Sequence, residues 1–470
     1  MLILNGSIKP RPDVLVVGGG AAALCAAISA RRAGVSVLLL ERAPVGERGG
    51  NSRHSRNFRY VHEGSSPFSA GPYPEVEFRR DLARVAGSDQ DPALLRLLIE
   101  RSTDLPDWLA SVGVRLQSVA GGGLPRSRKT AFLLGGGKTM LNALYATAAR
   151  LGVEIQNDAS VEALSLVGPA VQAVHYRLQA SNSRQWQGNG KLQVVYPRAS
   201  ILCSGGAQAD RAWLRTQCGA RADGFINRGT PHATGRVLRN LLSQGIVAKG
   251  DPTAAYLVAV DARSPSDDGG ILTRVRSMHA GIVVDRHGQR HYDESADTAS
   301  TRYAVWGQRL ADFPGQIGYL ILDRRGLQIE APSFYSPISA PDLAALARLL
   351  DLPAATLARS LEDYNAVMPP LEPPFFAFPM RPGITFTYHG VAVDSALRVR
   401  HQTQGPIANL FAAGMLMAPN LLSRGYLSGL ALMIGLATGR AAGAQAARVA
   451  ASAGTSRARG SRVAALATSR

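Results

Sequence analysis

The clearest pattern of apolar and polar positions lies near the N-terminus, between residues 13 and 41. An apolar run over residues 14–17 is followed at once by three glycines, and then by a stretch of small and apolar residues. A second apolar run, residues 35–40, ends on Glu41. Short apolar runs bounded by glycine predict buried strands, and the longer stretch between them predicts a helix. The pattern therefore predicts a strand, a tight turn, a helix and a second strand followed by an acid.

This arrangement is typical of the βαβ unit that binds the ADP half of a dinucleotide. Gly18 would allow the tight turn, and Gly20 would let the backbone approach the pyrophosphate. The helix would begin at Ala21 and Ala22, where its N-terminus favours negative charge. Glu41, which Arg42 follows, can accept hydrogen bonds from ribose hydroxyls. The unit alone does not separate NAD from FAD, and a βαβ unit without a ligand is the alternative.

The loop after this unit, residues 45–59, carries glycines, amides and many cationic side chains. Gly49, Gly50, Asn51 and Ser52 suit a loop folded against a flat polar ligand. The side chains that can carry positive charge near its end are Arg53, His54, Arg56 and Arg59. Such a cluster would offset charge on phosphates, on a reduced flavin or on a carboxylate substrate. We predict cofactor contacts up to residue 53, and substrate contacts for the last two arginines.

Two further apolar runs also end on glycine. Residues 199–206 end on Gly205 and Gly206, and residues 409–414 end on Gly414. The carboxyl ends of strands in one parallel sheet meet at the crevice where cofactors bind. A dehydrogenase that binds only NAD usually completes its nucleotide domain without interruption, whereas these strands are spread from residue 18 to residue 414. This spread favours FAD lying along the sheet.

From about residue 248 the character of the chain changes to polar loops with short strand-like runs. We predict an α/β fold in which a Rossmann-like FAD-binding domain is interrupted by an α+β capping domain. The first part of the FAD-binding domain would span 1–247, the capping domain 248–375 and the second part 376–450. The proline-rich stretch 369–382 is interpreted as a linker. The small, polar and basic residues 451–470 predict a disordered tail.

Composition narrows the class of protein. The chain has 470 residues, 46% of them hydrophobic, and no apolar run long enough to span a membrane. Its three cysteines, Cys25, Cys203 and Cys218, stand far apart, which favours a reducing, cytoplasmic compartment and argues against a metal site or an iron–sulfur cluster. The net charge is +18, but the basic residues form no run of five and no nucleic-acid motif is present. An anionic substrate is therefore a better explanation of the charge than nucleic acid, although a merely basic composition explains it as well.

Several of these stretches together resemble the fumarate reductase/succinate dehydrogenase flavoprotein superfamily. They are residues 13–41, 49–52, 203–206, 233–235, 390–394 and 410–414, so the resemblance covers nearly the whole chain except the tail. Residues 48–59, 261–263, 268–271, 385–388 and 425–426 look most like the tricarballylate dehydrogenase branch, which also includes a flavoprotein of cobalamin biosynthesis. The resemblance implies FAD and a site between the two domains. A small polycarboxylate would lose a proton to a base and a hydride to flavin N5, giving a C=C bond.

The resemblance, together with the motifs, assigns three groups of residues. The cofactor-binding group is Gly18, Gly20, Ala21, Ala22, Glu41, Arg42, Gly49, Gly50, Asn51, Ser52, Arg53, Ser204, Gly205, Thr234, Gly414, Met415, Ser428 and Gly429. The catalytic candidates are Arg302, Tyr388, His389 and Arg424. The substrate-binding candidates are Arg56, Arg59, Arg263 and Arg274.

The chain departs from the family pattern at several of these positions. Met415 stands where the superfamily often has a glutamate, and Phe386 stands where it has a substrate histidine. The arginine that the family has directly after an Asn-Glu pair is missing here. The first arginine after Asp293-Glu294 is Arg302. These departures argue against fumarate reduction. His54 has a different spacing from the histidine that links flavin covalently in membrane-bound relatives, so we expect non-covalent FAD.

Since no cysteine cluster is available, electrons would leave through a separate acceptor. An iron–sulfur or haem protein, or a quinone, would serve, and such a partner would offer a means of membrane association. The alternative to an enzyme is a non-catalytic flavin-binding subunit for electron transfer.

Overall fold

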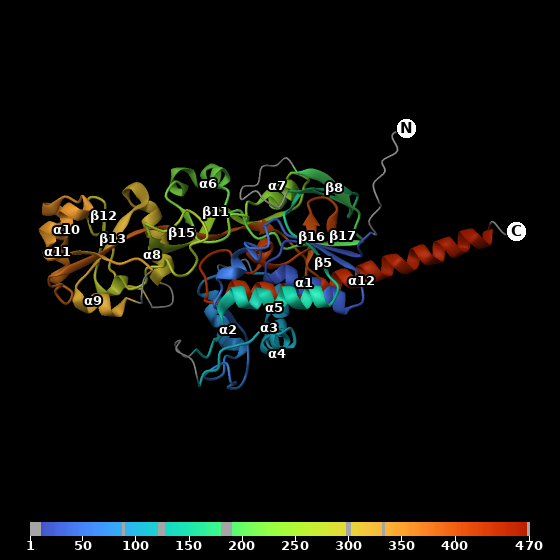
Figure 1. Ribbon diagram of the computed structural model, residues 1–470, viewed down its shortest axis with the longest axis horizontal. Coiled ribbons are helices and arrows are strands. Elements are labelled where there is room, and N and C mark those ends of the chain that lie inside the picture. Colours follow the sequence, from blue (N-terminus) through green and yellow to red (C-terminus); the bar gives the residue numbers. More distant parts are fainter. Residues whose placement is uncertain are drawn as a thin grey trace.

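The computed structural model describes residues 11–86, 90–120, 127–179, 190–297, 302–330 and 334–467. Figure 1 shows a body built around the N-terminal and C-terminal segments, with a second lobe at one end made from the middle of the chain. A long final helix, α12 (Leu430–Ala467), starts inside the body and projects beyond it (Figure 1).

The body is organised around a six-stranded sheet in the order β16-β17-β9-β1-β2-β5. The strands are β1 (Val14–Val17), β2 (Val37–Leu40), β5 (Glu154–Gln156), β9 (Ala199–Leu202), β16 (Arg398–His401) and β17 (Gly405–Ala412). All neighbours are parallel except β16 and β17. Both β1 and β2 are entirely buried, as their uninterrupted apolar runs predict for a parallel sheet covered on both faces.

Helix α1 (Ala21–Arg32) packs on this sheet, and α12 packs directly on α1. The close approach depends on glycines of α12, because a Cβ at Gly439 would collide with the carbonyl of Ala22. Around them lie α2 (Glu75–Ala83), α3 (Pro92–Ser102), α4 (Leu105–Ser111), α5 (Gly136–Arg150), α6 (Arg211–Cys218) and α7 (Arg236–Leu242). Two small sheets complete the body: β3 (Asn57–Arg59) with β4 (Thr130–Phe132), and β6 (Ala159–Val167), β7 (Ala170–Leu178) and β8 (Lys191–Val195).

The second lobe contains a mixed sheet in the order β10-β15-β13-β12, with β11 and β14 also paired to β15. Its strands are β10 (Ile226–Asn227), β11 (Ala248–Asp261), β12 (Ile282–Asp285), β13 (Gly318–Leu322), β14 (Ile338–Ala340) and β15 (Phe375–Val391). Its helices are α8 (Arg302–Asp312), α9 (Arg324–Ile329), α10 (Leu343–Leu350) and α11 (Ala354–Asn365). Strand β15 runs 17 residues and leads from this lobe back to the body.

Two expectations for irregular structure were wrong. The proline-rich stretch that we interpreted as a linker largely forms the first half of β15. Proline lacks an N–H but keeps its carbonyl, and Pro379 O accepts a hydrogen bond from Ala262 N at 2.8 Å. The predicted disordered tail is helical as far as Ala467, and its last three residues lie outside the described residues. In the part of the chain that the structure describes, no helix is long and apolar enough to cross a membrane.

Candidate active site

A cavity of about 1080 Å³, open to solvent, lies at the carboxyl ends of β1, β2 and β9. Three segments that are far apart in sequence form its floor: residues 17–22, 203–206 and 414–415. Glu41, Arg42 and residues 232–237 close one end, and residues 50–52 lie at the other side. This is the crevice that the three glycine-ended runs predict.

The turn after β1 requires its glycines for packing reasons that the structure makes explicit. Gly18 has φ +113°, and a Cβ there would stand 2.5 Å from the carbonyl oxygen of Cys203 at the end of β9. A Cβ at Gly19 would collide with the carboxylate of Glu41 and the hydroxyl of Tyr145. Gly20 has more room, since its nearest protein atom would be 3.4 Å away. The turn therefore presents bare backbone to the cavity.

Glu41 and Arg42 follow β2 and both line this cavity. Glu41 is 6% exposed, and its Oε1 accepts a hydrogen bond from Ala43 N at 2.7 Å. Burial raises the pKa of Glu41 to about 7, because a low-dielectric surrounding disfavours the charged form. Arg42 donates from Nη1 to Thr234 Oγ1 at 2.5 Å, and burial lowers its pKa to about 10. A buried carboxyl group of this kind can accept a hydrogen bond from a hydroxyl group of a ligand in the cavity.

The residues present fit FAD. Ser52 Oγ accepts from Ala21 N at 3.1 Å, which brings the cationic loop to the N-terminus of α1. Gln208 is 3% exposed and lines the cavity, and among the described residues its Oε1 has no hydrogen-bond partner. A glycine turn, a helix N-terminus, a buried acid and an unsatisfied amide match the pyrophosphate and ribose of a dinucleotide.

A second cavity of about 960 Å³ adjoins the first. The two share a wall formed by Asn51, Ser52, Phe386, Met415, Ala431 and Leu432. Asn51 holds this wall together, because its Nδ2 donates to Thr385 O at 2.6 Å and its Oδ1 accepts from Thr230 N at 2.9 Å. Ligands in the two cavities would therefore meet between the cationic loop and strand β15.

The second cavity is strongly cationic. Arg56, Arg228, Arg274 and His54 line it, and none of the described residues that line it is an aspartate or glutamate. Arg228 is 9% exposed; its Nη1 donates to Thr385 Oγ1 at 2.8 Å and its Nε to Gly270 O at 3.1 Å. A buried guanidinium oriented by two neutral acceptors is well placed to hold a carboxylate.

One side of the second cavity is aromatic. Phe386 stacks on Tyr256 with ring centroids 5.1 Å apart, and Tyr426 lies 4.6 Å from Tyr256. Tyr388, predicted to be catalytic, does not line either cavity: its ring packs edge-on against Phe386 and its hydroxyl donates to Gly425 O. It supports the aromatic wall from behind.

His54 connects the cationic loop to the second lobe. Its Nε2 lies 2.5 Å from Asp268 Oδ1, and Arg53 Nη1 lies 3.4 Å from Asp268 Oδ2. Arg53 therefore pairs with Asp268 of the second lobe and lines neither cavity, although we predicted that it contacts the cofactor. Gly49, predicted likewise, also lies outside both walls and packs against Leu141.

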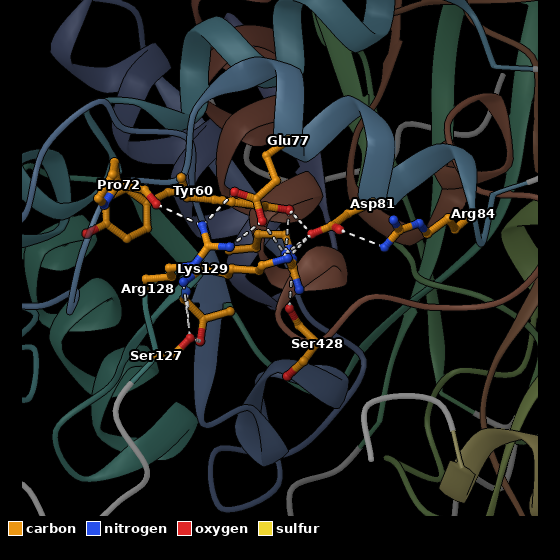
Figure 2. A network of polar contacts seen from close by, with 12 residues as sticks. Tyr60, Pro72, Glu77, Asp81, Arg84, Ser127, Arg128, Lys129 and Ser428 are labelled. Carbon is orange, nitrogen blue, oxygen red and sulfur yellow. Dashed lines mark hydrogen bonds and ion pairs between the residues drawn. The ribbon is translucent and has the colours of Figure 1, made fainter. Parts of the chain in front are cut away.

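Arg59, predicted to bind substrate, is buried beneath the second cavity rather than in its wall. It is 6% exposed, donates to Tyr73 Oη at 2.6 Å and lies 3.5 Å from Asp81 Oδ2. Its Nε also donates to Ser428 O at 3.2 Å, and Ser428 does line the cavity. Figure 2 shows the network around Asp81, in which Lys129, Arg84 and Ser428 come together from separate segments. Arg59 thus supports the wall through Ser428 and does not line the cavity itself.

Four other predicted residues lie outside both cavities. Arg263 pairs with Asp261 at 2.6 Å, and Arg302 donates to Asp297 O at 2.7 Å. His389 is 8% exposed and stacks on Trp213, while Arg424 is exposed. These side chains are held by partners of their own or face solvent.

The remaining predicted residues do line the cavities. In the first cavity these are Gly18, Gly20, Ala21, Ala22, Glu41, Arg42, Gly50, Asn51, Ser52, Ser204, Gly205, Thr234, Gly414 and Met415. In the second they are Ser428, Gly429, Arg56 and Arg274. Sequence reasoning missed Arg228, Tyr256, Tyr426 and Gln208. An arginine between a buried strand and Gly229 was the one available signal for Arg228.

Comparisons with known proteins agree with this geometry. The family model described as FAD binding domain matches residues 13–422. The NADH:fumarate oxidoreductase of Klebsiella pneumoniae is 25% identical over 87% of this chain, and the chain spans only 45% of that relative. A fumarate reductase (cytochrome) of Shewanella frigidimarina is 25% identical over 93% of this chain and 77% of its own length.

Among solved structures, the 3-ketosteroid-delta4-(5alpha)-dehydrogenase of Rhodococcus jostii RHA1 has the same fold. It superposes with a TM-score of 0.71 at 21% identity and covers 95% of this chain and 98% of its own. The family match, the relatives and the cavity together identify the cofactor as FAD. The chain belongs to the FAD-binding domain family, and it is similar over most of its length to fumarate reductases.

Proposed function

We propose that this protein is an FAD-dependent oxidoreductase that dehydrogenates a small polycarboxylate, with tricarballylate as the model substrate, to form a C=C bond. The observation that carries the proposal is the second cavity, where three arginines and a histidine line the wall and none of the described lining residues is acidic. That cavity adjoins the one that fits FAD.

The side chains have separate roles in this reaction. Bound FAD would supply the two-electron oxidant. Arg56, Arg228 and Arg274 would bind the carboxylates, and their positive charge would make the neighbouring C–H bonds more acidic. The wall of Tyr256, Phe386 and Tyr426 would exclude water from the reacting carbons.

Anaerobic mixing tests the proposal. Purified protein carrying FAD would be mixed with tricarballylate, succinate or the trimethyl ester of tricarballylate, and the visible flavin absorbance followed. We expect a free acid to bleach the flavin and the neutral ester to leave it unchanged, because only the acid can pair with the arginines. Failure of every free acid, or equal bleaching by the ester, would contradict the proposal.

A second candidate is the oxidation or reduction of a neutral ring substrate, which the stacked aromatic wall favours. The ester comparison separates the two candidates, since a neutral substrate gains nothing from the arginines. A flavoprotein of cobalamin biosynthesis and a non-catalytic electron-transfer subunit are the further alternatives. Both predict a yellow protein whose flavin no small carboxylate bleaches.

We further propose that a separate acceptor, either a quinone or an iron–sulfur or haem protein, reoxidises the flavin, and that the protein works in the cytoplasm. Within the described part of the chain no group of three or more His, Cys, Asp or Glu side chains could hold a metal. Stopped-flow reoxidation of the reduced protein by a soluble quinone, compared with oxygen alone, tests the acceptor. Reoxidation that is as fast with oxygen alone would argue against it.

A further inference from the structure

We propose that His54, oriented by Asp268, is the base that removes the proton in this reaction. The inference rests on the proposed function and names the proton acceptor that the proposal leaves open. It places the base on the cationic loop and its orienting carboxylate on the second lobe.

Few of the side chains that line the second cavity can accept a proton. The titratable side chains that line the second cavity are His54, Tyr256, Tyr426 and three arginines. Arginine stays protonated in proteins, and a tyrosine hydroxyl ordinarily holds its proton up to a pH of about 10. An imidazole is the side chain that is neutral and able to accept a proton near neutral pH. Within the described wall, His54 is therefore the group equipped for the task.

A hydrogen bond to Asp268 sets the tautomer of His54. His54 Nε2 lies 2.5 Å from Asp268 Oδ1, and an ionised carboxylate can only accept. The proton of neutral His54 is therefore on Nε2, and the lone pair is on Nδ1. Burial by itself would raise the pKa of Asp268, but its contacts with His54 and Arg53 lower it below its usual range. The carboxylate thus stays ionised to stabilise the imidazolium.

The other ring nitrogen of His54, Nδ1, lies beside Gly270. A Cβ at Gly270 would stand 2.6 Å from His54 Nδ1, and Gly270, with φ +64°, itself lines the second cavity. A glycine at this place leaves Nδ1 uncovered by any side chain from residue 270. Asp268 is held in a left-handed conformation, φ 63°, by its backbone N–H, which donates to Gly229 O at 2.9 Å.

A C–H bond next to a substrate carboxylate breaks, and its proton forms an N–H bond at His54 Nδ1. The electron pair left behind becomes the second bond of the C=C group while the adjacent carbon loses a hydride. The two-electron oxidant for that hydride would be the bound FAD of the proposed function. His54 ends as an imidazolium paired with Asp268.

The groups around His54 that can carry charge bear on how the rate of flavin reduction depends on pH. Asp268 and Arg53 contact it or its partner, Arg56, Arg228 and Arg274 share its cavity, and His232 acts on Asp268 from the first cavity. A protonated imidazole has no lone pair with which to accept the proton of the substrate. Reduction of the flavin should therefore fall on the acid side as His54 becomes protonated. Removing the charge of Asp268 should move that acid limb to lower pH.

The experiment compares His54→Gln with the matched control His389→Gln, whose histidine lies outside both cavities. Anaerobic flavin reduction by the best carboxylate would be measured against pH. We expect His54→Gln to be slower by about 100-fold or more and to lose the acid limb, as is typical when a general base is removed. His389→Gln should keep the wild-type rate and limb.

Binding is measured separately with malonate, a dicarboxylate that has no adjacent pair of C–H carbons and cannot form a C=C bond. His54→Gln should retain FAD and the malonate-induced change of the flavin spectrum, which a general loss of structure would remove. If His54→Gln loses FAD, the Asp268→Asn variant tests the inference instead. A slower reaction whose acid limb lies at lower pH would support the inference. An acid limb at the wild-type pH would overturn it.

Wild-type rate and pH limb in His54→Gln would overturn the inference and leave the proposed function intact. A wild-type protein that no carboxylate reduces would instead refute the proposed function, and the inference with it.

Discussion

The two cavities adjoin each other but are built in different ways. The first is formed by the ends of parallel strands and the turns directly after them, at residues 17–22, 41–42 and 203–206. The second is formed by a loop of the body, by the end of β10, by residues 256 and 270–274 of the other lobe, and by the start of α12. The first cavity therefore depends on local backbone geometry, and the second depends on how distant segments meet.

This difference explains why the chemistry of the second cavity can vary within one fold. A turn whose glycines touch the neighbouring strand tolerates few substitutions, as the contact of Gly18 with Cys203 shows. A side chain such as Arg274 reaches the second cavity from a loop, where another residue could stand without disturbing the sheet.

Gly18→Ala should abolish FAD retention. Its Cβ would stand 2.5 Å from a backbone carbonyl, and φ +113° is unfavourable for any other residue. FAD content after gel filtration measures the effect, with circular dichroism to verify the fold. The matched control is Gly34→Ala, at φ +88° with nothing within 4 Å of the added Cβ. It should lose about 1 kcal/mol of stability and keep FAD; equal FAD content in both variants would show that the turn is not the determinant.

Asp81→Asn should destabilise the support of the second cavity by roughly 3 kcal/mol in the free energy of unfolding. It removes the carboxylate that lies 3.5 Å from the buried guanidinium of Arg59 and 2.6 Å from Lys129 Nζ. Figure 2 shows Asp81 and Lys129 in this network. Burial tends to raise the pKa of Asp81, but hydrogen bonds from Lys129 and Tyr73 lower it overall. Because that pKa is depressed, the contribution to stability exists above the ordinary pKa of aspartate and is lost as the pH falls through the depressed value.

Urea unfolding at neutral pH measures this change. Glu77→Gln is the control, since Glu77 belongs to the same network through Lys129 and Arg128 but lies towards solvent. It should cost less than about 1 kcal/mol. If Asp81→Asn lowers the free energy of unfolding no more than the control does, the pair of Asp81 and Arg59 does not stabilise the wall of the second cavity.

The same contrast explains which site residues could be predicted from the sequence and which could not. Gly18, Glu41 and Gly205 are recognisable because strand, turn and helix follow one another within a short stretch. Arg56 and Arg59 stand three positions apart in one loop and look equivalent in sequence, yet Arg56 lines the cavity and Arg59 is captured by Asp81 from α2. Which acid meets which arginine depends on tertiary packing, and periodicity carries no information about it.

Glu41→Gln should remove the pH dependence of FAD binding. The pKa of Glu41 is raised to about 7 in the protein without ligand, and ribose hydroxyls that donate to the carboxylate would lower it again. Wild-type affinity should therefore increase with pH, by up to about tenfold between pH 6 and 8, since one pKa unit corresponds to a factor of ten. Quenching of FAD fluorescence by apoprotein at each pH measures the affinity. A pH-independent wild type, or a Glu41→Gln variant with the wild-type slope, would contradict this role.

Arg263→Gln should have the smallest effect on turnover, although the sequence placed Arg263 with Arg274 in the substrate group. Arg274 lines the second cavity, whereas Arg263 is committed to Asp261, which is completely buried. Arg274→Gln should raise KM for the best carboxylate by about tenfold or more, the usual cost of losing a charged hydrogen bond. Arg263→Gln should leave KM unchanged and lower stability, because the carboxylate of Asp261 loses its cation. A measured increase of KM in both variants would mean that the lobe around residue 263 closes onto the substrate, and that the boundary of the second cavity extends beyond its present wall.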